Sequence, residues 1–400
     1  MRLLMKRATY LNYLGGLGYV TKDLLIEGDR ISLIADQIDP LPSDHVMDLD
    51  GFYVVPGLID VHVHLCWDGS VDPTHTLSSE SRELTLLRMA RHARETVLSG
   101  ITTVRDLGAV DDLSLALSEA THKGIAVGPR IIGAGKTLIM TGGHDPFWGI
   151  GTDGPWEAVK RVRQQVKKGA KVIKVSATGG VYGRTEGEEV GQSELTREEL
   201  KAICLEAHRL GVRVASHALG EEGVENSVLA GCDTIEHGIF ASEKTLRAMA
   251  EQGTYLTPTL FIYRKIAEGN APDYAKEKAK RVVDTHRRCF SKAVQEGVKI
   301  LAGSDAGSPE APHPALFQEM NEMVRLGLSP LEVIRISTLM NAEALGLGHY
   351  LGSIEQGKTA DLIVLTGNPA EGLNMPGRLW GVLKAGVFLR RGDDPFAGRV

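Results

Sequence analysis

Two histidines separated by one valine, His62 and His64, end the sequence PGLIDVHVH at residues 56–64. Side chains alternate between the two faces of a β-strand, so an HxH pair on a strand directs both imidazoles to the same face. Such a pair can bind one divalent cation, and it can equally be a pair of satisfied core histidines. The spacing alone supports the two interpretations about equally.

Four further polar residues occupy matching places in a repeated pattern of a helical stretch, a glycine and a short β-rich run. They are Lys174, His217, His237 and Asp305, which follow Gly169, Gly211, Gly231 and Gly297. In a barrel of parallel strands, active sites gather at the carboxyl ends of the strands. Independent core histidines are not expected at matching places in successive units, so the complete set favours a metal site.

The chemistry of each residue type supports this interpretation. Lysine is usually solvated, but Lys174 lies in the apolar run KVIKV, where a buried amine must lose its proton or meet an opposite charge. Asp305, in GSDAG, fits an ordinary turn aspartate and also a metal ligand that acts as general base. His217 and His237 offer the nitrogen ligands that suit zinc.

The glycine-ended units also predict the fold that positions these residues. Strands are expected directly after Gly100, Gly169, Gly211, Gly231, Gly253 and Gly297, because a left-handed glycine ends a helix. Repeated helix-to-strand steps predict an α/β protein, and their number favours a closed (β/α)8 TIM barrel. A doubly wound sheet is the alternative, although the GxGxxG turn of a Rossmann domain is missing after the first strand.

Both ends of the chain read differently from its middle. Short β-rich runs separated by turn residues occur within residues 23–55 and 352–365. We expect a small β-sandwich domain built from residues 1–56 and 351–400, with the barrel spanning residues 57–350.

The composition of the 400 residues limits the function classes. The chain is 42% hydrophobic, enough for one large and one small domain. Its 45 basic and 51 acidic residues are interspersed, with a net charge of −6, which argues against nucleic acid or an anionic membrane as partner. Four cysteines without a CxxC pair suggest neither a zinc ribbon nor a disulfide framework. Without a signal-peptide pattern or an apolar run of about 20 residues, we expect a soluble, cytoplasmic protein.

As a set, these residues resemble the amidohydrolase superfamily through nearly the whole chain. The resemblance rests on PGLID with His62 and His64, on Lys174, His217, His237 and Asp305, and on GKTADL at residues 357–362. It implies two divalent metal ions, with zinc expected. His62 and His64 would bind one ion together with Asp305, and His217 and His237 would bind the other. A carbamylated Lys174 and a hydroxide would bridge the two ions, and the resemblance also implies a homo-oligomer.

Within the superfamily, IKV and ATGG at residues 173–175 and 177–180, and MTGGH at residues 140–144, look like the imidazolonepropionase-related metal-dependent dipeptidases that act on Xaa-Pro. This resemblance implies a dipeptide-like small-molecule substrate, either a dipeptide or an N-acyl amino acid. The bridging hydroxide would attack the amide, and Asp305 would serve as general base. His144 would bind the substrate or polarise the scissile carbonyl, and its alternative is a histidine of a surface loop.

Leu219 departs from the pattern, because members of the group often carry an aromatic or second polar residue after the His-Ala pair. The candidates to recognise a substrate carboxylate instead are Tyr182, Arg184, Tyr263 and Arg264. Arginine suits a carboxylate through its fork of donors, although most loop arginines face water. Two other functions remain open. One is a cyclic-amide, imidazolone or carbamate hydrolase or deaminase with the same site, and the other is a non-catalytic metal-binding protein.

Overall fold

The computed structural model describes residues 2–13, 16–183 and 187–392. The chain divides into two compact units. The smaller unit comprises Met1–Ile59, Arg94–Thr103 and Met323–Val400, and the larger comprises Asp60–Ala93 and Val104–Glu322. Residues 323–350 thus belong to the smaller unit, whereas the domain boundaries at residues 56 and 350 remain a prediction.

The larger unit contains a seven-stranded sheet in which every neighbouring pair is parallel. Its order is β10 (Gly149–Gly151), β9 (Thr137–Ile139), β11 (Val172–Ser176), β12 (Arg213–Ala218), β13 (Thr234–His237), β14 (Tyr255–Thr257) and β15 (Lys299–Ile300). A three-stranded sheet has the order β6 (Leu58–Val63), β7 (Ile101–Asp106) and β8 (Arg130–Gly133). The strands predicted after the six glycines are therefore present.

Backbone hydrogen bonds link the edges of these two sheets. The chain that continues from β15 is bonded to the end of β6, because Asp305 N donates to His62 O over 2.8 Å and His64 N donates to Ala306 O over 2.8 Å. On the other side, Lys171 N donates to Gly133 O over 3.0 Å. The ends of β6, β11, β12 and β13 thereby belong to one connected hydrogen-bonded framework.

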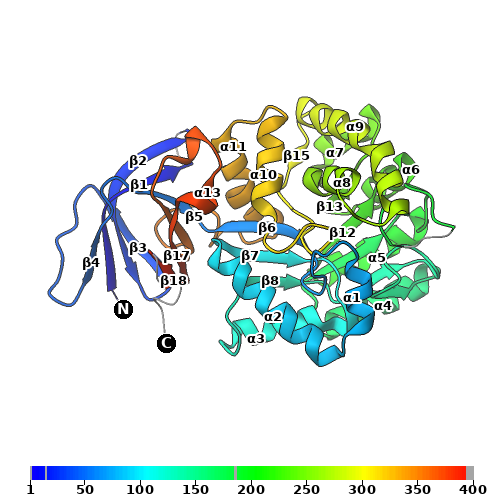
Figure 1. Ribbon diagram of the computed structural model, residues 1–400, viewed down its shortest axis with the longest axis horizontal. Helices are drawn as coiled ribbons and strands as arrows, with labels where there is room; N and C mark the ends of the chain where they lie inside the picture. Colours follow the sequence, from blue (N-terminus) through cyan, green and yellow to red (C-terminus); the bar gives the residue numbers. More distant parts are fainter. Residues whose placement is uncertain (1, 14–15, 184–186, 393–400) are drawn as a thin grey trace. The chain divides into compact units, whose positions relative to one another are not determined.

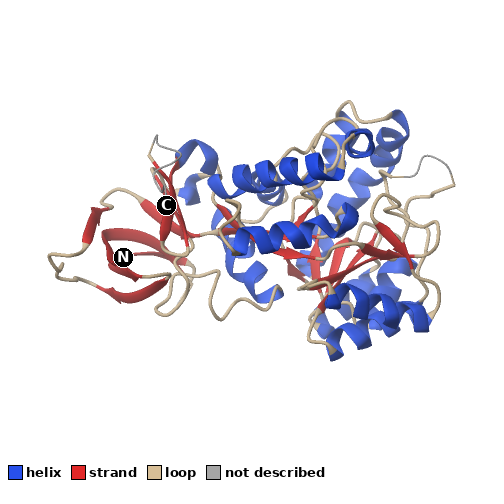
Figure 2. Cartoon of the chain, turned by 90° about the horizontal axis from the view of Figure 1, so that it is seen from below, coloured by secondary structure: helices blue, strands red, loops and turns tan. Residues whose placement is uncertain are grey.

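Helices alternate with strands along the chain and lie on both sides of the strands of the larger unit (Figures 1 and 2). The helices that begin in the larger unit are α1 (Pro73–Ser79), α2 (Arg82–Leu98), η1 (Val110–Asp112), α3 (Leu113–His122), α4 (Pro155–Lys167), α5 (Arg197–Arg209), α6 (Glu221–Ala230), α7 (Glu243–Gln252), α8 (Leu260–Glu268), α9 (Asp273–Gln295) and α10 (Leu316–Arg325). The smaller unit contains α11 (Pro330–Arg335), η2 (Ile336–Met340), α12 (Asn341–Ala344), η3 (Pro369–Glu371) and α13 (Met375–Arg378). The six predicted glycines all have positive φ, from +72° at Gly211 to +101° at Gly169. The α/β class and the helix–glycine–strand units are thus confirmed.

Strands from both ends of the chain form one sheet in the smaller unit. Its order is β18 (Val387–Arg391), β17 (Leu379–Lys384), β16 (Leu362–Leu365), β5 (Tyr53–Pro56), β1 (Arg2–Asn12), β2 (Gly18–Glu27) and β3 (Arg30–Ala35), and β4 (His45–Asp48) also pairs with β1. On one edge β1 pairs with β4 through residues 3–6 and with β5 through residues 9–10, and on its other edge its register with β2 shifts between Met5 and Ala8. Leu24, Val364 and Leu383 lie in the core of this unit.

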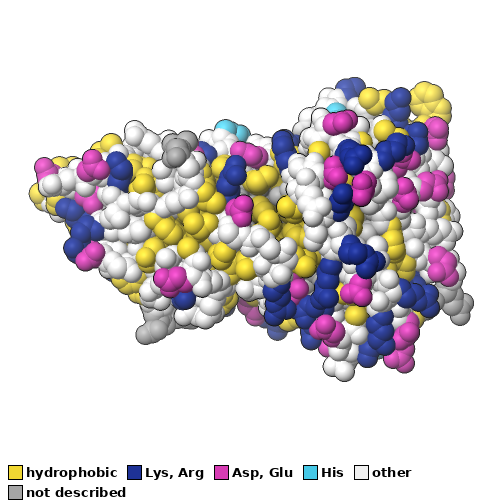
Figure 3. Space-filling model, turned by 90° about the horizontal axis from the view of Figure 1, so that it is seen from above, with side chains coloured by type: hydrophobic (Ala, Val, Ile, Leu, Met, Phe, Trp, Pro, Cys, Tyr) yellow, Lys and Arg dark blue, Asp and Glu magenta, His cyan; other side chains and the backbone are white. Residues whose placement is uncertain are grey.

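Charged side chains of both signs are mixed on the surface, as they are along the sequence. On the face drawn in Figure 3, basic and acidic side chains are interspersed. Cys66, Cys204, Cys232 and Cys289 are buried free thiols, as expected for a chain without a disulfide framework. Within the described ranges, no helix combines the length and the apolar character needed to cross a membrane.

Candidate metal centre and active site

One pocket of the larger unit gathers nearly all the predicted site residues. It is a partly enclosed pocket lined mainly by polar side chains at its base. The predicted residues in its lining are His62, His64, His144, Lys174, Tyr182, His217, His237, Tyr263 and Asp305. Arg184 lies outside the described residues. Arg264 donates instead to Glu268 and Glu322, so its guanidinium is engaged by two carboxylates.

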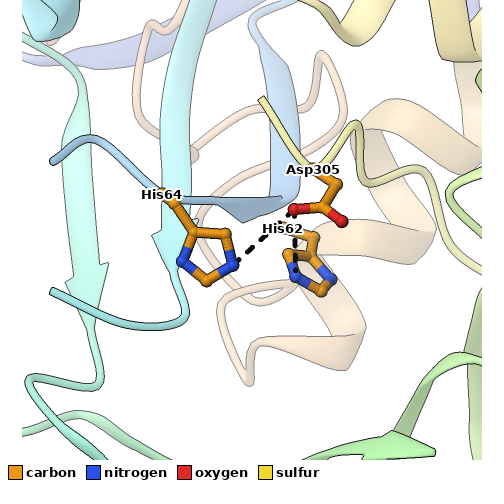
Figure 4. A group of neighbouring side chains, drawn as sticks. All are labelled: His62, His64 and Asp305. Carbon is orange, nitrogen blue, oxygen red and sulfur yellow. Dashed lines mark ion pairs between the residues drawn. The ribbon is translucent and has the colours of Figure 1, made fainter. Parts of the chain in front are cut away.

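Three of these side chains converge at the end of β6. The Nε2 atoms of His62 and His64 lie 3.7 and 3.6 Å from Oδ1 of Asp305, and Figure 4 shows both imidazoles directed at the same carboxylate oxygen. Ligands about 2.1 Å from a tetrahedral zinc ion lie about 3.4 Å from one another. The spacing of these three atoms therefore fits a shared divalent cation.

Hydrogen bonds of the other ring nitrogens fix the tautomers of these histidines. Nδ1 of His62 donates to Oε2 of Glu236 over 2.9 Å, and Nδ1 of His64 donates to the carbonyl of Gly108 over 3.1 Å. Because a carbonyl and a carboxylate only accept, each neutral ring keeps its lone pair on Nε2. Burial, followed by the charge of Lys174, lowers the pKa of His62 and so favours the neutral, metal-binding form.

In the second pair of predicted ligands, His217 and His237, the Nε2 atom of each ring is also available to bind a metal ion. The hydroxyl of Thr259 donates to the carbonyl of Pro258, so it accepts the hydrogen bond from Nδ1 of His237 at 2.7 Å and leaves Nε2 with the lone pair. Nε2 of His217 is buried and has no hydrogen-bond partner among the described residues. Because buried polar atoms are nearly always satisfied, this nitrogen fits a metal ligand. The rings of His217 and His237 lie 4.7 Å apart.

Lys174 lies within β11 and is only 1% exposed, so a solvated lysine is excluded. Burial lowers the pKa of its amine, although the carboxylates of Glu236 and Asp145 act in the opposite direction. Asp305 is also buried, and burial raises the pKa of its carboxyl group despite the opposing effect of His64. We call these buried groups the pocket floor. It consists of the imidazoles of His62, His64, His217 and His237, the amine of Lys174 and the carboxyl group of Asp305.

His144 lies in the segment between β9 and β10, and its side chain is buried and lines the pocket, unlike that of a solvent-exposed loop histidine. Its Nδ1 donates to Oε1 of Glu188 over 2.6 Å, and its ring stacks on His217 with centroids 4.2 Å apart. Burial alone would lower the pKa of His144, but the carboxylates of Asp145 and Glu188 outweigh that effect and raise it. The hydrogen bond from His144 helps to lower the pKa of Glu188 to about 2 even though burial opposes it. His144 therefore favours the cationic form.

The backbone at the floor of the pocket is held in uncommon conformations. Asp145, His237, Thr259 and Asp305 have φ of +63°, +75°, +52° and +57°. Non-glycine residues rarely adopt these angles, and they cluster where the surrounding structure imposes them on a functional site. A close approach adds to this constraint, because a Cβ at Gly303 would lie 2.7 Å from Cβ of His62.

Three functional residues were missed by the sequence analysis. Asp145 lines the pocket and accepts a hydrogen bond from the Ser176 hydroxyl over 2.9 Å, and its only sequence signal is its place after His144. Glu236 accepts from His62 and, over 2.7 Å, from the buried guanidinium of Arg105. A glutamate and an arginine inside apolar strand sequences could have marked this pair. No local pattern joins two residues that are 131 positions apart.

Comparison with known proteins agrees with this geometry. The model of the amidohydrolase family matches residues 53–389. Ochratoxinase of Aspergillus niger is 29% identical over 392 residues, which cover 88% of this chain and 78% of that protein. Imidazolonepropionase of Aeromonas hydrophila subsp. hydrophila is 27% identical over 372 residues, with 83% and 82% covered. The crystal structure of a Xaa-Pro dipeptidase with methionine bound in the active site superposes with a TM-score of 0.89 at 32% identity, covering 97% of this chain and 99% of that one.

Proposed function

Because this chain belongs to the amidohydrolase family, we propose that it hydrolyses the amide bond of dipeptides or N-acyl amino acids, with Xaa-Pro or a similar dipeptide as substrate. The proposal rests on one observation: Lys174, Asp305 and imidazole rings whose Nδ1 hydrogen bonds leave the lone pair on Nε2 all line one pocket. The likeness to a Xaa-Pro dipeptidase supports the choice of bond.

The proposal includes a finer description of the fold. The strands of the larger unit close into a (β/α)8 barrel, and the hydrogen bonds at both sheet edges, Asp305 to His62 and Lys171 to Gly133, support that closure. We also propose that the single sheet formed by the terminal strands folds over on itself as a β-sandwich. The proposed domains are the sandwich, from residues 1–56 and 351–400, and the barrel, from residues 57–350. An active site at the carboxyl ends of the strands is what a barrel leads us to expect.

The donor set fits two divalent cations such as zinc. His62, His64 and Asp305 would hold one and His217 and His237 the other, with carbamylated Lys174 shared between them. Carbamylation joins the neutral amine of Lys174 to CO2 and releases a proton, and the lowered pKa of this amine supports the step. When bound, divalent cations supply Lewis acidity toward the substrate carbonyl and favour deprotonation of the attacking water.

The side chains of the pocket perform the remaining steps. Asp305 accepts a proton from the attacking water and returns it to the leaving nitrogen. The hydroxyl of Ser308 donates to Oδ1 of Asp305 over 2.9 Å and holds the carboxylate in place. His144 donates a hydrogen bond to the carbonyl oxygen of the substrate. Its raised pKa favours the protonated ring, which would stabilise the negative charge that develops there, and Glu188 holds the ring.

A substrate panel tests this function. The zinc-loaded protein is assayed in parallel with dipeptides, N-acyl amino acids, lactams, an imidazolone and carbamates. We expect turnover of a linear amide and its loss after chelation. Turnover of cyclic substrates alone would replace the dipeptidase proposal with the second candidate, which the similarity to imidazolonepropionase supports. About two metal ions per chain with no turnover of any substrate would indicate a binding protein.

A further inference from the structure

Part of the pocket lining takes no part in the proposed amide chemistry. It consists of the apolar or aromatic side chains of Trp67, Val181, Tyr182, Ile262 and Ile266. Each of these residues is at most 7% exposed. The pocket therefore joins a polar floor that holds the reacting groups to an apolar wall that contacts some other part of the substrate.

Trp67 is a rigid element of this wall. Its indole meets the ring of Trp148 edge to face, with centroids 4.6 Å apart, and the ring of Tyr182 at 5.5 Å and 72°. Such edge-to-face pairs are a favoured arrangement of aromatic rings. The backbone N of Trp67 donates to the carbonyl of His64 over 3.0 Å, so the indole is anchored directly beside the metal centre.

Tyr182 presents its ring to the pocket, because its hydroxyl is already used. The hydroxyl donates to Oδ1 of Asp72 over 2.5 Å and accepts from the backbone N of Thr74 over 3.2 Å. The ring also lies nearly parallel to that of Tyr274, at 12° and 6.3 Å. A substrate carboxylate would have to displace the bond to Asp72 to reach the hydroxyl, whereas the ring carbons are available without rearrangement.

Aliphatic side chains complete the wall. Ile262 and Ile266 lie four residues apart on α8, so they project from the same face of that helix. Both are almost fully buried, at 1% and 2% exposure. Val181 adds a third branched side chain next to Tyr182. A charged group placed against these carbons would lose its hydration without a compensating partner.

We propose that Trp67, Val181, Tyr182, Ile262 and Ile266 form a subsite for an aromatic ring, so that the hydrolysed amides carry an aromatic group next to the scissile bond. The inference rests on the proposed function and names its substrate class. Two fixed rings at edge-to-face geometry accept a third flat ring at low cost in conformational entropy, because this wall is preorganised. We name these five residues the aromatic subsite.

Matched substrates test the aromatic subsite on the zinc-loaded wild-type protein. N-acetyl-L-phenylalanine is compared with N-acetyl-L-alanine, and N-benzoylglycine with N-acetylglycine. The two pairs place the ring on the amine side and on the acyl side of the amide. We expect kcat/KM to be about tenfold or more higher for the ring-bearing member of at least one pair. Ratios near one in both pairs, with all four amides hydrolysed, would overturn the subsite and leave the amidohydrolase activity intact.

Substitutions of Tyr182 separate its ring from its hydroxyl. Tyr182→Leu removes the ring, and we expect the aromatic preference to fall to about threefold or less. Tyr182→Phe is the matched control, because it loses the bonds to Asp72 and Thr74 but keeps the ring and should keep the preference. If both variants lost the preference equally, the hydroxyl would be the recognition element and the aromatic subsite would be wrong.

Binding of product fragments supplies a readout that does not require turnover. L-phenylalanine is compared with L-alanine, and benzoate with acetate, by calorimetric titration of the zinc-loaded protein. We expect the ring to lower the dissociation constant about tenfold or more in the pair that matches the preferred substrate side. Equal affinities within both pairs would refute the subsite. Tighter binding of the ring without turnover of any amide would retain the subsite and refute the proposed function.

Discussion

Three of the imidazoles that we propose as metal ligands have their Nδ1 atoms, which do not face the proposed metal site, held by hydrogen bonds. Glu236, Gly108 and Thr259 hold the Nδ1 protons of His62, His64 and His237. A ring whose tautomer is fixed by a neighbour binds a cation without first losing a proton or reorienting. The site therefore depends on these hydrogen-bond partners as well as on the proposed ligands. Two of the partners are common groups, the backbone carbonyl of Gly108 and the hydroxyl of Thr259, which a sequence does not mark as functional.

The role of Asp305 gives the first prediction. Asp305→Asn keeps the shape of the side chain but removes the base, so we expect kcat/KM to fall by at least about 10²-fold. Metal content measured in the same samples should remain largely unchanged. Ser308→Ala is the control, because it removes only the hydrogen bond to Oδ1 and should cost far less. Near-normal rates in Asp305→Asn would show that another group is the base.

The pair of Glu236 and Arg105 gives the second prediction. Glu236→Gln removes the charge that orients His62 and leaves the guanidinium of Arg105 buried without its counter-charge. We expect zinc affinity to fall by about 10- to 100-fold, measured by competition with a chromogenic chelator. The free energy of unfolding should fall by about 3–5 kcal/mol.

A matched control for this variant is Glu319→Gln. Glu319 is equally buried in the same unit, but burial raises the pKa of its carboxyl group to about 8, so it is largely neutral at pH 7. Glutamine is then nearly isosteric with the protonated side chain, and zinc affinity should stay within about threefold of wild type. Equal losses of affinity in the two variants would mean that Glu236 has no special role in orienting His62.

At the scale of the elements, α8 depends on a residue of another helix. The carboxyl group of Glu319 in α10 accepts hydrogen bonds from the backbone N of Leu260 and Phe261, over 2.9 and 2.7 Å. These are the first residues of α8, whose N–H groups have no partner within the helix. The helix that supplies Ile262 and Ile266 to the aromatic subsite is thus fixed at its start by Glu319.

The buried state of Glu319 gives the third prediction, a dependence of stability on pH. Its folded pKa of about 8 lies above the ordinary value of 4.5, so the folded state binds the proton more tightly than the unfolded state. The associated stability is complete below about pH 4.5 and is lost as the pH rises to about 8. Urea unfolding at pH 5.5 and 8 should therefore show a larger decrease for wild type than for Glu319→Gln. Identical pH dependence in both proteins would contradict this account.

The elements also show what the sequence could predict. Helix ends and following strands were predictable because a single residue, such as Gly211 or Gly231, determines each boundary through its own backbone. The convergence of Lys174, His217, His237 and Asp305 on one pocket was predictable because each follows a glycine-ended helix at a matching place in its unit. The aromatic subsite and the bonds of Glu236 were not, because they join segments far apart in the sequence. Arg184, a candidate from a glycine-rich loop, lies outside the described residues and stays a prediction.

At the scale of the whole molecule, the proposed metal centre would connect strands that the chain order separates. The predicted ligands come from β6, β11, β12 and β13 and from the segment after β15. A cation bound by side chains of all these segments stabilises the folded state over the unfolded one. The terminal strands form the sheet of the other unit, as their β-rich sequences predicted, whereas the cytoplasmic location and the homo-oligomer stay predictions.

Metal removal gives the fourth prediction. Dialysis against a chelator should abolish turnover and lower the thermal midpoint, since ligand at about 100 times its dissociation constant contributes about 2.7 kcal/mol. Calorimetry of the metal-free and zinc-loaded protein measures this shift, and added zinc should restore both properties. The matched control is the Glu236→Gln variant, whose shift on zinc addition should be smaller at the same zinc concentration. A midpoint unaffected by chelation would argue against a cation that spans these strands.

The anchored hydroxyl of Tyr182 has a consequence for observing the pocket from outside. Its acceptor bond reaches the backbone amide of Thr74, at the beginning of α1, a short helix that is partly accessible to solvent. A molecule that rests on the ring restrains the hydroxyl, and the hydroxyl restrains that amide. Deuterium uptake at Thr74 should therefore slow when the pocket is filled, so α1 serves as a built-in reporter of occupancy that needs neither a label nor a reaction.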